Sequence, residues 1–253
     1  PYNAQTKSFD DISGYGFEFI FLGLPYTTEY PKEYDFKYFA QNSRLCYVPY
    51  GSSYADGKEM LRVSLTNNML MSVDYLFADC DKVYQYCNSK LKLCKNADSK
   101  KIVYNIGFPR FDLVEREKKS IGIKTFLWLP RWTTSTDNNE KSTFFENKDV
   151  FIKYFQSHPE LSLIIRPHPL MFAHYIDTGV MSKTEVDAYK QLIINTPNIT
   201  LDENPSYIGS FKKADCLIAD YSSVVIEYFI TGRPVIYLNG TKTIERSIAD
   251  AFY

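Results

Sequence analysis

The chain lacks several features that would point at once to a class of protein. Its 253 residues contain no run of about 18 apolar residues, so the sequence predicts no membrane-spanning helix. It has no basic excess, and a formal net charge of −1 argues against broad electrostatic binding of nucleic acid. No signal peptide is recognisable, and the sequence begins at Pro1 rather than Met. We therefore expect a trimmed or processed piece with sequence missing upstream.

Patterns that bind metal ions are also scarce. The five cysteines form no C-x-x-C pair, and their odd number is typical of reduced thiols in the cytoplasm. Cys80, Cys87 and Cys94 recur every seven residues, a spacing that would place them on one helical face. No histidine lies near them, so we expect no metal ion there. We expect no cofactor and a cytoplasmic location.

What the second half does have is a regular alternation of short apolar segments with amphipathic ones. Strands are expected at Thr125–Leu129, Leu161–Arg166, Ile199–Leu201, Cys216–Ala219 and Pro234–Leu238. Helices are expected between them, at Lys148–Ser157, Lys183–Asn195, Tyr207–Lys213 and Ser223–Ile230. Ser182 and Glu185 have the spacing of a capping box at the start of the second helix. This alternation is typical of a parallel sheet covered on both faces.

The first half is aromatic and less regular. Strands are expected at Glu18–Leu24, Arg44–Val48 and Lys82–Tyr86, and helices at Ser64–Ala78 and from Ser89 onward. The turn from Gly107 to Asp112 and the charged stretch after it then interrupt the chain. We therefore predict a first domain at residues 1–106, a linker at 107–120 and a second domain at 121–253.

Polar side chains follow three of the strands expected in the second domain. Ligands of an open parallel sheet bind beyond the carboxyl ends of its strands. Arg131 follows the first strand, Arg166 and His168 the second, and Asp220 and Ser222 the fourth. The sequence therefore predicts that these side chains converge at one edge of the sheet.

The turn from Asp220 to Ser223 leaves a buried strand and begins a helix. A helix N-terminus offers unpaired N–H groups and partial positive charge, and serine hydroxyls add donors, so the turn is suited to phosphate. Simple N-capping is the alternative, and the basic groups at neighbouring strand ends favour an anion. Glu227 lies one turn below Ser223 among apolar neighbours, where an acid can accept the hydroxyls of a ribose; an exposed helix charge is the alternative.

The three histidines have different expected roles. His168 lies between two prolines that fix the backbone and display its ring, so it can donate to phosphate or act as an acid or base. A plain surface turn is the alternative. His158 is expected to cap the end of a helix, and His174 to lie in a loop.

Taken together, these segments resemble the CDP-glycerol glycerophosphotransferase family of teichoic-acid and capsule polymerases. The segment Ala214–Tyr228 resembles the family's most specific signature, which contains an Asp-Tyr-Ser-Ser turn and an acidic helix residue. Arg166–Pro169 and Gly107–Asp112 resemble two further motifs. Leu129–Thr133 resembles a fourth, with the arginine before the tryptophan instead of after it. The four motifs occur in the family's order.

The resemblance implies an α/β fold of the GT-B type, in which two Rossmann-like domains with parallel sheets face a cleft, the first domain being incomplete here. It implies transfer of glycerol phosphate, or a related polyol or sugar phosphate, from a CDP-linked donor to a lipid-linked, cell-wall or capsule acceptor. Peripheral contact with the cytoplasmic face of the membrane is implied as well. The expected donor-binding residues are Arg131, Arg166, Asp220, Ser222, Ser223 and Glu227, and the expected catalytic residues are His168 and Tyr50.

Tyr50 departs from the family's pattern. An inverting transfer requires a base for the acceptor hydroxyl, and the resemblance places a His-Gly element where Tyr50-Gly51 stands here. A phenol, with a reference pKa of ~10, is a poor base at neutral pH. Either Tyr50 is activated, or another residue such as Asp56 or Asp79 serves, or the donor and chemistry differ.

Two other functions stay open. A GT-B glycosyltransferase with a UDP-type sugar donor usually has a Gly-rich or Glu-rich donor loop, whereas serines stand here. The second is a non-catalytic relic that binds nucleotide or polymer but has lost its catalytic base. Tyr50, which stands where a histidine is expected, favours this function.

Overall fold

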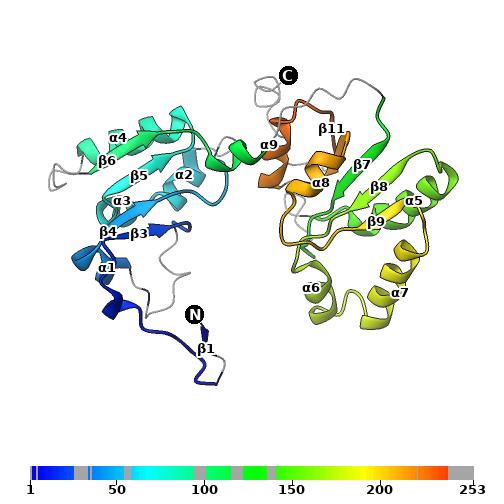
Figure 1. Cartoon of the computed structure of the whole chain (residues 1–253), viewed down its shortest axis with the longest axis horizontal. Helices are drawn as coiled ribbons and strands as arrows, with labels where there is room; N and C mark the ends of the chain where they lie inside the picture. Colours follow the sequence, from blue (N-terminus) through cyan, green and yellow to red (C-terminus); the bar gives the residue numbers. More distant parts are fainter. Residues whose placement is uncertain are drawn as a thin grey trace. The chain divides into compact units, whose positions relative to one another are not determined.

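The computed structural model describes residues 2–3, 5–25, 34, 36–53, 58–93, 101–114, 122–135, 141–220 and 222–238. It divides into two compact units, Pro1–Pro109 and Arg110–Tyr253, each built on a parallel sheet of its own (Figure 1). The predicted α/β fold with two Rossmann-like units is confirmed.

The first unit has a four-stranded sheet in the order β3-β4-β5-β6. The strands are β3 (Phe19–Leu22), β4 (Arg44–Tyr47), β5 (Tyr75–Ala78) and β6 (Ile102–Asn105), all parallel to their neighbours. The helices are α1 (Phe36–Asn42), α2 (Lys58–Ser64), α3 (Asn67–Ser72) and α4 (Asp81–Leu93). A short antiparallel pair, β1 (Tyr2–Asn3) and β2 (Ser8–Phe9), and the 3-10 helix η1 (Ser13–Tyr15) precede them.

The two faces of this sheet differ. Leu22, Leu45 and Leu76 belong to a core that also includes residues of α3 and α4. Successive strand residues point to opposite faces, and on the other face Phe21 of β3 and Tyr104 of β6 are 66% and 43% exposed. Among the described residues, the core cluster of the first unit therefore lies on one side of its sheet.

Two elements predicted for this unit were wrong. The helix predicted at Ser64–Ala78 is the short α3, capped by Thr66, followed by strand β5. Asp74 ends the helical pattern, because its carboxylate accepts the backbone N–H of Leu45 on the neighbouring strand at 2.8 Å. The strand predicted at Lys82–Tyr86 lies within α4, where Val83 and Cys87 are buried four residues apart, a helical spacing.

The second unit has a five-stranded parallel sheet in the order β11-β10-β7-β8-β9. The strands are β7 (Thr125–Leu129), β8 (Ser162–Ile165), β9 (Ile199–Leu201), β10 (Cys216–Ala219) and β11 (Val235–Tyr237). The helices are η4 (Pro109–Leu113), which spans the boundary of the two units, α5 (Phe144–Ser157), α6 (Met171–Asp177), α7 (Lys183–Ile194), α8 (Ile208–Lys213) and α9 (Ser223–Phe229). All five predicted strands and four predicted helices are confirmed, as is the capping box of Ser182 and Glu185. Helix α6 was not predicted.

The strand order fixes where a ligand can bind to this unit. The chain adds β8 and β9 on one side of β7 and then crosses to place β10 and β11 on the other side. The order therefore reverses between β7 and β10. In doubly wound sheets the crevice at such a switch point, beyond the carboxyl ends of the strands, is the usual ligand site.

Among the residues that the structure describes, no helix combines the length and the apolar composition needed to cross a membrane. The same residues hold no group of three or more His, Cys, Asp or Glu side chains placed to bind a metal ion. Cys80 and Cys87 are buried, and burial raises the pKa of the Cys87 thiol to about 12. Cys94 lies outside the described residues.

Candidate functional site

Asp220 joins two loops across the switch point. It follows β10 and is fully buried. Its carboxylate accepts the backbone N–H of Arg131, which follows β7, at 2.8 Å. It also accepts the backbone N–H of Thr143 at 3.1 Å and the Thr143 hydroxyl at 2.6 Å, at the start of α5. These three donors fix the carboxylate of Asp220, which in turn holds the loops of the predicted site in place.

The peptide of Arg131 is fixed from both sides. Besides the bond of its N–H to Asp220, its carbonyl accepts the hydroxyls of Ser142 at 2.6 Å and Tyr175 at 3.2 Å. Burial raises the pKa of Tyr175, so the phenol stays a donor at neutral pH. The Arg131 side chain turns along its own loop, where Nε donates to the Thr133 hydroxyl at 3.3 Å. The loop after β7 is therefore held in one conformation.

Trp132 brings two histidines together beside this loop. Its ring stacks on His168 at 5.4 Å between centroids and meets His174 edge-on at 5.0 Å. His174 lies in α6, so its predicted loop position was wrong. Its Nε2 is 3.1 Å from the hydroxyl of Thr134. The loops after β7 and β8 thus meet through aromatic rings, which sequence reasoning missed.

His168 has a defined tautomer. Its Nδ1 accepts the backbone N–H of Leu170 at 3.2 Å, so the proton of the neutral ring lies on Nε2. Burial lowers the pKa of His168 below its usual 6.5, which keeps the ring neutral at pH 7. One side of the ring packs on Trp132, but the residue as a whole is exposed, so Nε2–H can donate to a ligand. By contrast, His158 ends α5 and its Nδ1 lies 2.8 Å from the carbonyl of Tyr154, so its predicted capping role is confirmed.

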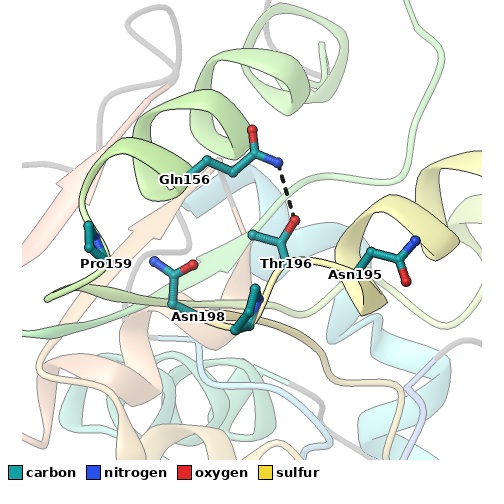
Figure 2. A pocket seen from close by; sticks show the side chains of 6 residues that line it. Gln156, Pro159, Asn195, Thr196 and Asn198 are labelled. Carbon is teal, nitrogen blue, oxygen red and sulfur yellow. Dashed lines mark hydrogen bonds between the residues drawn. The ribbon is translucent and has the colours of Figure 1, made fainter.

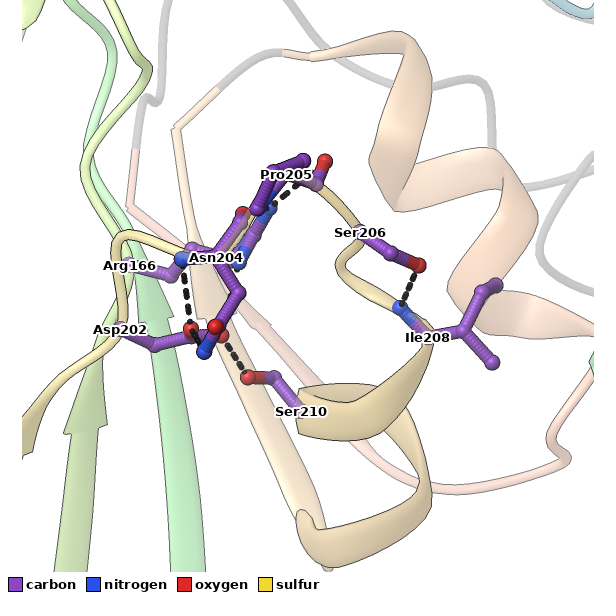
Figure 3. A network of polar contacts seen from close by, with 7 residues as sticks. All are labelled: Arg166, Asp202, Asn204, Pro205, Ser206, Ile208 and Ser210. Carbon is purple, nitrogen blue, oxygen red and sulfur yellow. Dashed lines mark hydrogen bonds and ion pairs between the residues drawn. The ribbon is translucent and has the colours of Figure 1, made fainter.

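Arg166 belongs to a buried polar network (Figure 3). Its Nη1 lies 2.7 Å from Oδ2 of Asp202, and its Nη2 donates to the carbonyl of Asn204 at 2.7 Å. Ser210 of α8 donates to the same Asp202 oxygen, and Asn204 donates to the other. Although burial raises the pKa of Asp202, these hydrogen bonds and Arg166 lower it to about 2. The network ties the ends of β8 and β9 to α8.

Ser222 caps α9. Its side chain accepts the backbone N–H of Val224 at 3.3 Å, so the capping that the sequence allows is present. Ser223, the first residue of this seven-residue helix, is exposed. The neighbouring Tyr221 lies outside the described residues. Anion binding by the two serines stays a prediction.

Glu227 is 1% exposed, which rules out the alternative of an exposed helix charge. Its Oε2 accepts the hydroxyl of Tyr207 and lies 3.6 Å from Nε of Arg110. The Arg110 guanidinium also lies over the Tyr207 ring, 4.8 Å from its centre. Burial raises the pKa of Glu227, and Tyr207 and Arg110 partly offset this. Sequence reasoning missed both partners, because Tyr207 was seen only as a helix end and Arg110 only as linker.

Tyr50 and Asp79 lie at the carboxyl edge of the first unit's sheet. Tyr50 follows β4, is 54% exposed, and its N–H donates to the carbonyl of Gly23 at 3.2 Å. Asp79 follows β5 and is 1% exposed, and its Oδ2 accepts the backbone N–H of Ser53 at 2.5 Å. Its Oδ1 is buried without a hydrogen-bond partner, and burial raises its pKa. Asp79 thus supports the loop that carries Tyr50.

Asp79 and Asp81 form a D-x-D pattern, so the prediction that the sequence contains no such pair, which had argued against a metal ion, was wrong. Asp81 lies at the start of α4, and its Oδ1 accepts the side-chain amide of Asn105 at 2.5 Å. Asp56, the other substitute base considered, lies outside the described residues.

An open hollow of about 410 Å³ lies elsewhere on the second unit (Figure 2). It is lined by Gln156, Pro159, Asn195, Thr196, Pro197 and Asn198. It adjoins the start of β9, at the amino edge of the sheet and away from the predicted site residues. Asn198 donates to the carbonyls of Phe155 and Leu161 at 2.7 and 2.8 Å, so this side chain closes a loop. The hollow contains none of the predicted site residues.

The sequence matches a known protein family over most of its length. Residues 70–240, more than half of the chain, match the family CDP-Glycerol:Poly(glycerophosphate) glycerophosphotransferase. The chain belongs to this family. The predicted resemblance is confirmed, and the protein is a member of a transferase family. No curated protein matches the sequence.

Two solved structures, with TM-scores of 0.52 and 0.50, support the fold. A putative UDP-N-acetylglucosamine 2-epimerase from Listeria monocytogenes is similar over 92% of this chain, with a TM-score of 0.52 and 14% identity. A variant of the wall teichoic acid polymerase TagF is similar over 93%, with a TM-score of 0.50 and 15% identity. A second structure of TagF covers 82% of the chain at a TM-score of 0.45 and 19% identity. This chain spans 60%, 67% and 51% of those three chains, respectively.

Proposed function

We propose that the protein is part of a transferase that moves glycerol phosphate, or a related polyol or sugar phosphate, from a CDP-linked donor to a cell-wall or capsule polymer. One observation carries the proposal: the family match includes the switch point where Asp220 joins the loops of Arg131 and Ser222. A lipid-linked acceptor and peripheral contact with the cytoplasmic face of the membrane are part of the same proposal.

The diphosphate of the donor would lie against the start of α9. Ser222 and Ser223 supply hydroxyls there, and the N–H groups of the first helical turn favour an anion. Nε2–H of His168 donates to a phosphate oxygen, which fits its neutral ring. Arg131 adds positive charge from the neighbouring loop. In this proposal, Asp220 and Arg166 hold those loops in place, because their contacts are with the protein.

The ribose of the donor would be bound by Glu227. The carboxylate is buried on the helix that begins at the phosphate-binding turn, one turn from Ser223.

The reaction is a displacement at phosphorus. The acceptor hydroxyl attacks the phosphorus that carries the polyol, a new P–O bond forms, and the P–O bond to the bridging oxygen breaks. CMP leaves with that oxygen and its electron pair, and the hydroxyl proton passes to a base. His168, as a neutral ring, donates Nε2–H to a phosphate oxygen and stabilises its charge by that hydrogen bond. Tyr50, exposed at the strand ends of the first unit, is the proposed proton acceptor, with Asp79 anchoring its loop. This role requires a phenol that loses its proton more easily than the reference pKa of ~10 allows.

Release of CMP tests this function. Purified protein is incubated with CDP-glycerol, with and without a poly(glycerol phosphate) acceptor, and CMP is followed by ³¹P NMR. CMP that forms only with acceptor supports the transfer, and Tyr50→Phe should abolish it while leaving CDP binding intact. Turnover of a UDP-sugar instead would identify a glycosyltransferase. Binding of CDP without turnover of either donor would favour the non-catalytic alternative.

A further inference from the structure

The carboxylate of Glu227 is held through one oxygen only. Oε2 contacts both the Tyr207 hydroxyl and Nε of Arg110. Oε1 accepts no hydrogen bond from any residue that the structure describes. Oε1 is not one of the fully buried polar atoms without a partner, so it stays open to a donor from outside the protein. The protein therefore fixes one carboxylate oxygen of Glu227, Oε2, while the other, Oε1, is suited to accept a hydrogen bond from a ligand.

The two partners come from segments far apart in the sequence. Arg110 lies in η4, Tyr207 just before α8, and Glu227 on α9. The Arg110 guanidinium covers the Tyr207 ring, so the cation and the phenol support each other as well as Glu227. A carboxylate held in this way cannot rotate about its last bond without losing both contacts.

From this geometry we infer that Tyr207 and Arg110 are positioning residues: they orient Glu227 so that Oε1 accepts a hydroxyl of the ribose in a nucleoside diphosphate. The inference rests on the proposed function, which puts the donor's ribose at Glu227. It goes further by assigning the discrimination between ribose and deoxyribose to two residues outside the Asp220–Glu227 segment.

The supporting loop is itself rigid. Tyr207 lies between Asn204 and Ser210, and both are bonded to Asp202. Arg166 closes this network from the end of β8. The position of Tyr207, and through it that of Glu227, therefore depends on buried contacts already present without a ligand. Such support preserves the orientation of a binding group.

The test compares the binding of CDP with that of 2′-deoxy-CDP and 3′-deoxy-CDP by calorimetry. The wild-type protein should prefer CDP over at least one deoxy analogue by roughly tenfold or more, as expected for loss of a hydrogen bond to a charged group. Tyr207→Phe and Arg110→Gln should bring that ratio close to one, and Arg110→Lys should restore part of it. Glu227→Gln should lower the ratio as well.

The matched control is Tyr189→Phe. Tyr189 is another buried tyrosine of the second unit, and its hydroxyl has no hydrogen-bond partner, so its removal should leave the ratio unchanged. A merely structural role of Tyr207 would lower the stability without changing the ratio.

The remaining outcomes distinguish a failure of this inference from a failure of the proposed function. Wild-type discrimination that survives in Tyr207→Phe and Arg110→Gln would overturn the inference and leave the donor site standing. Equal wild-type binding of CDP and both deoxy analogues would overturn the inference and the ribose role of Glu227, but not CDP binding. If no nucleotide binds, both the inference and the proposed function fall.

Discussion

The carboxylate of Asp220 accepts the backbone N–H of Arg131 at 2.8 Å, which ties the loop after β10 to the loop after β7. These strands are neighbours in the sheet, and their register pair Cys216 and Phe126 lies 90 residues apart in the chain, so the bond links distant segments at the switch point. The conformation of the proposed donor site depends on this bond.

Replacing Asp220 should therefore affect both stability and binding. Asp220→Ala leaves three donors without their acceptor, two of them on Thr143, and should lower the free energy of unfolding by roughly 3 kcal/mol. Urea denaturation measures this loss, and nucleotide affinity should fall with it. Asp177→Ala, at an exposed helix end, is the control and should stay within about 0.5 kcal/mol. A stable Asp220→Ala protein would show that the loops hold without the bond.

Asp202 should make stability depend on acid pH. Its pKa of about 2 in the folded protein lies below the value of roughly 3.9 for an unfolded aspartate, so it contributes stability above that value and loses it as pH falls toward 2. Asp202→Asn should cost about 2 kcal/mol at pH 7, measured by denaturation. The difference in free energy of unfolding between the wild type and Asp202→Asn should shrink below about pH 4. A gap that does not change with pH would mean that the charge of Asp202 is not what stabilises the loop.

Asp79 should act in the opposite sense. Burial raises its pKa, so its ionisation weakens the folded state increasingly as pH rises from the unfolded value of roughly 4 through the folded value. Asp79→Asn keeps an acceptor for the N–H of Ser53 and removes the charge. The melting temperature of Asp79→Asn relative to the wild type should rise with pH over this window. If the difference falls with pH, the carboxylate is stabilised by a group that the burial argument omits.

His168 should bind phosphate through Nε2–H. His168→Ala should weaken CDP binding by about tenfold, the effect of one hydrogen bond to a charged group. His168→Gln, whose amide nitrogen lies near the place of Nε2, should restore part of the affinity. His158→Ala is the control, because His158 caps a helix away from the loops after β7 and β8. Equal affinities for wild type and His168→Ala would remove this residue from the phosphate site.

The second unit's fold could be predicted from the sequence because its elements are marked locally. Cys216–Ala219 is wholly apolar and ends at Asp220, and Ser182 and Glu185 mark the start of α7. In the first unit, the apolar spacing of Ser64–Ala78 fits a helix throughout. Contacts with distant residues show where the helix stops: Asp74 bonds to Leu45, 29 residues away, and Lys101 donates to the carbonyl of Val73.

The site could be predicted only where its residues follow strand ends. Arg166 was expected to meet the donor, but its guanidinium is committed to Asp202, 36 residues further along the chain. The partners of Glu227 are equally distant, because Tyr207 precedes it by 20 residues and Arg110 lies in another segment. Such pairings arise from the packing of helices on the sheet. No spacing in the sequence marks them.

The most direct test of the central claim is a calorimetric titration of the protein with CDP, CMP, UDP and GDP, repeated with Ser223→Ala and His168→Ala. The donor-site account predicts that CDP binds most tightly and that both variants weaken it. Tighter binding of UDP or GDP than of CDP, or CDP binding that neither variant changes, would contradict it.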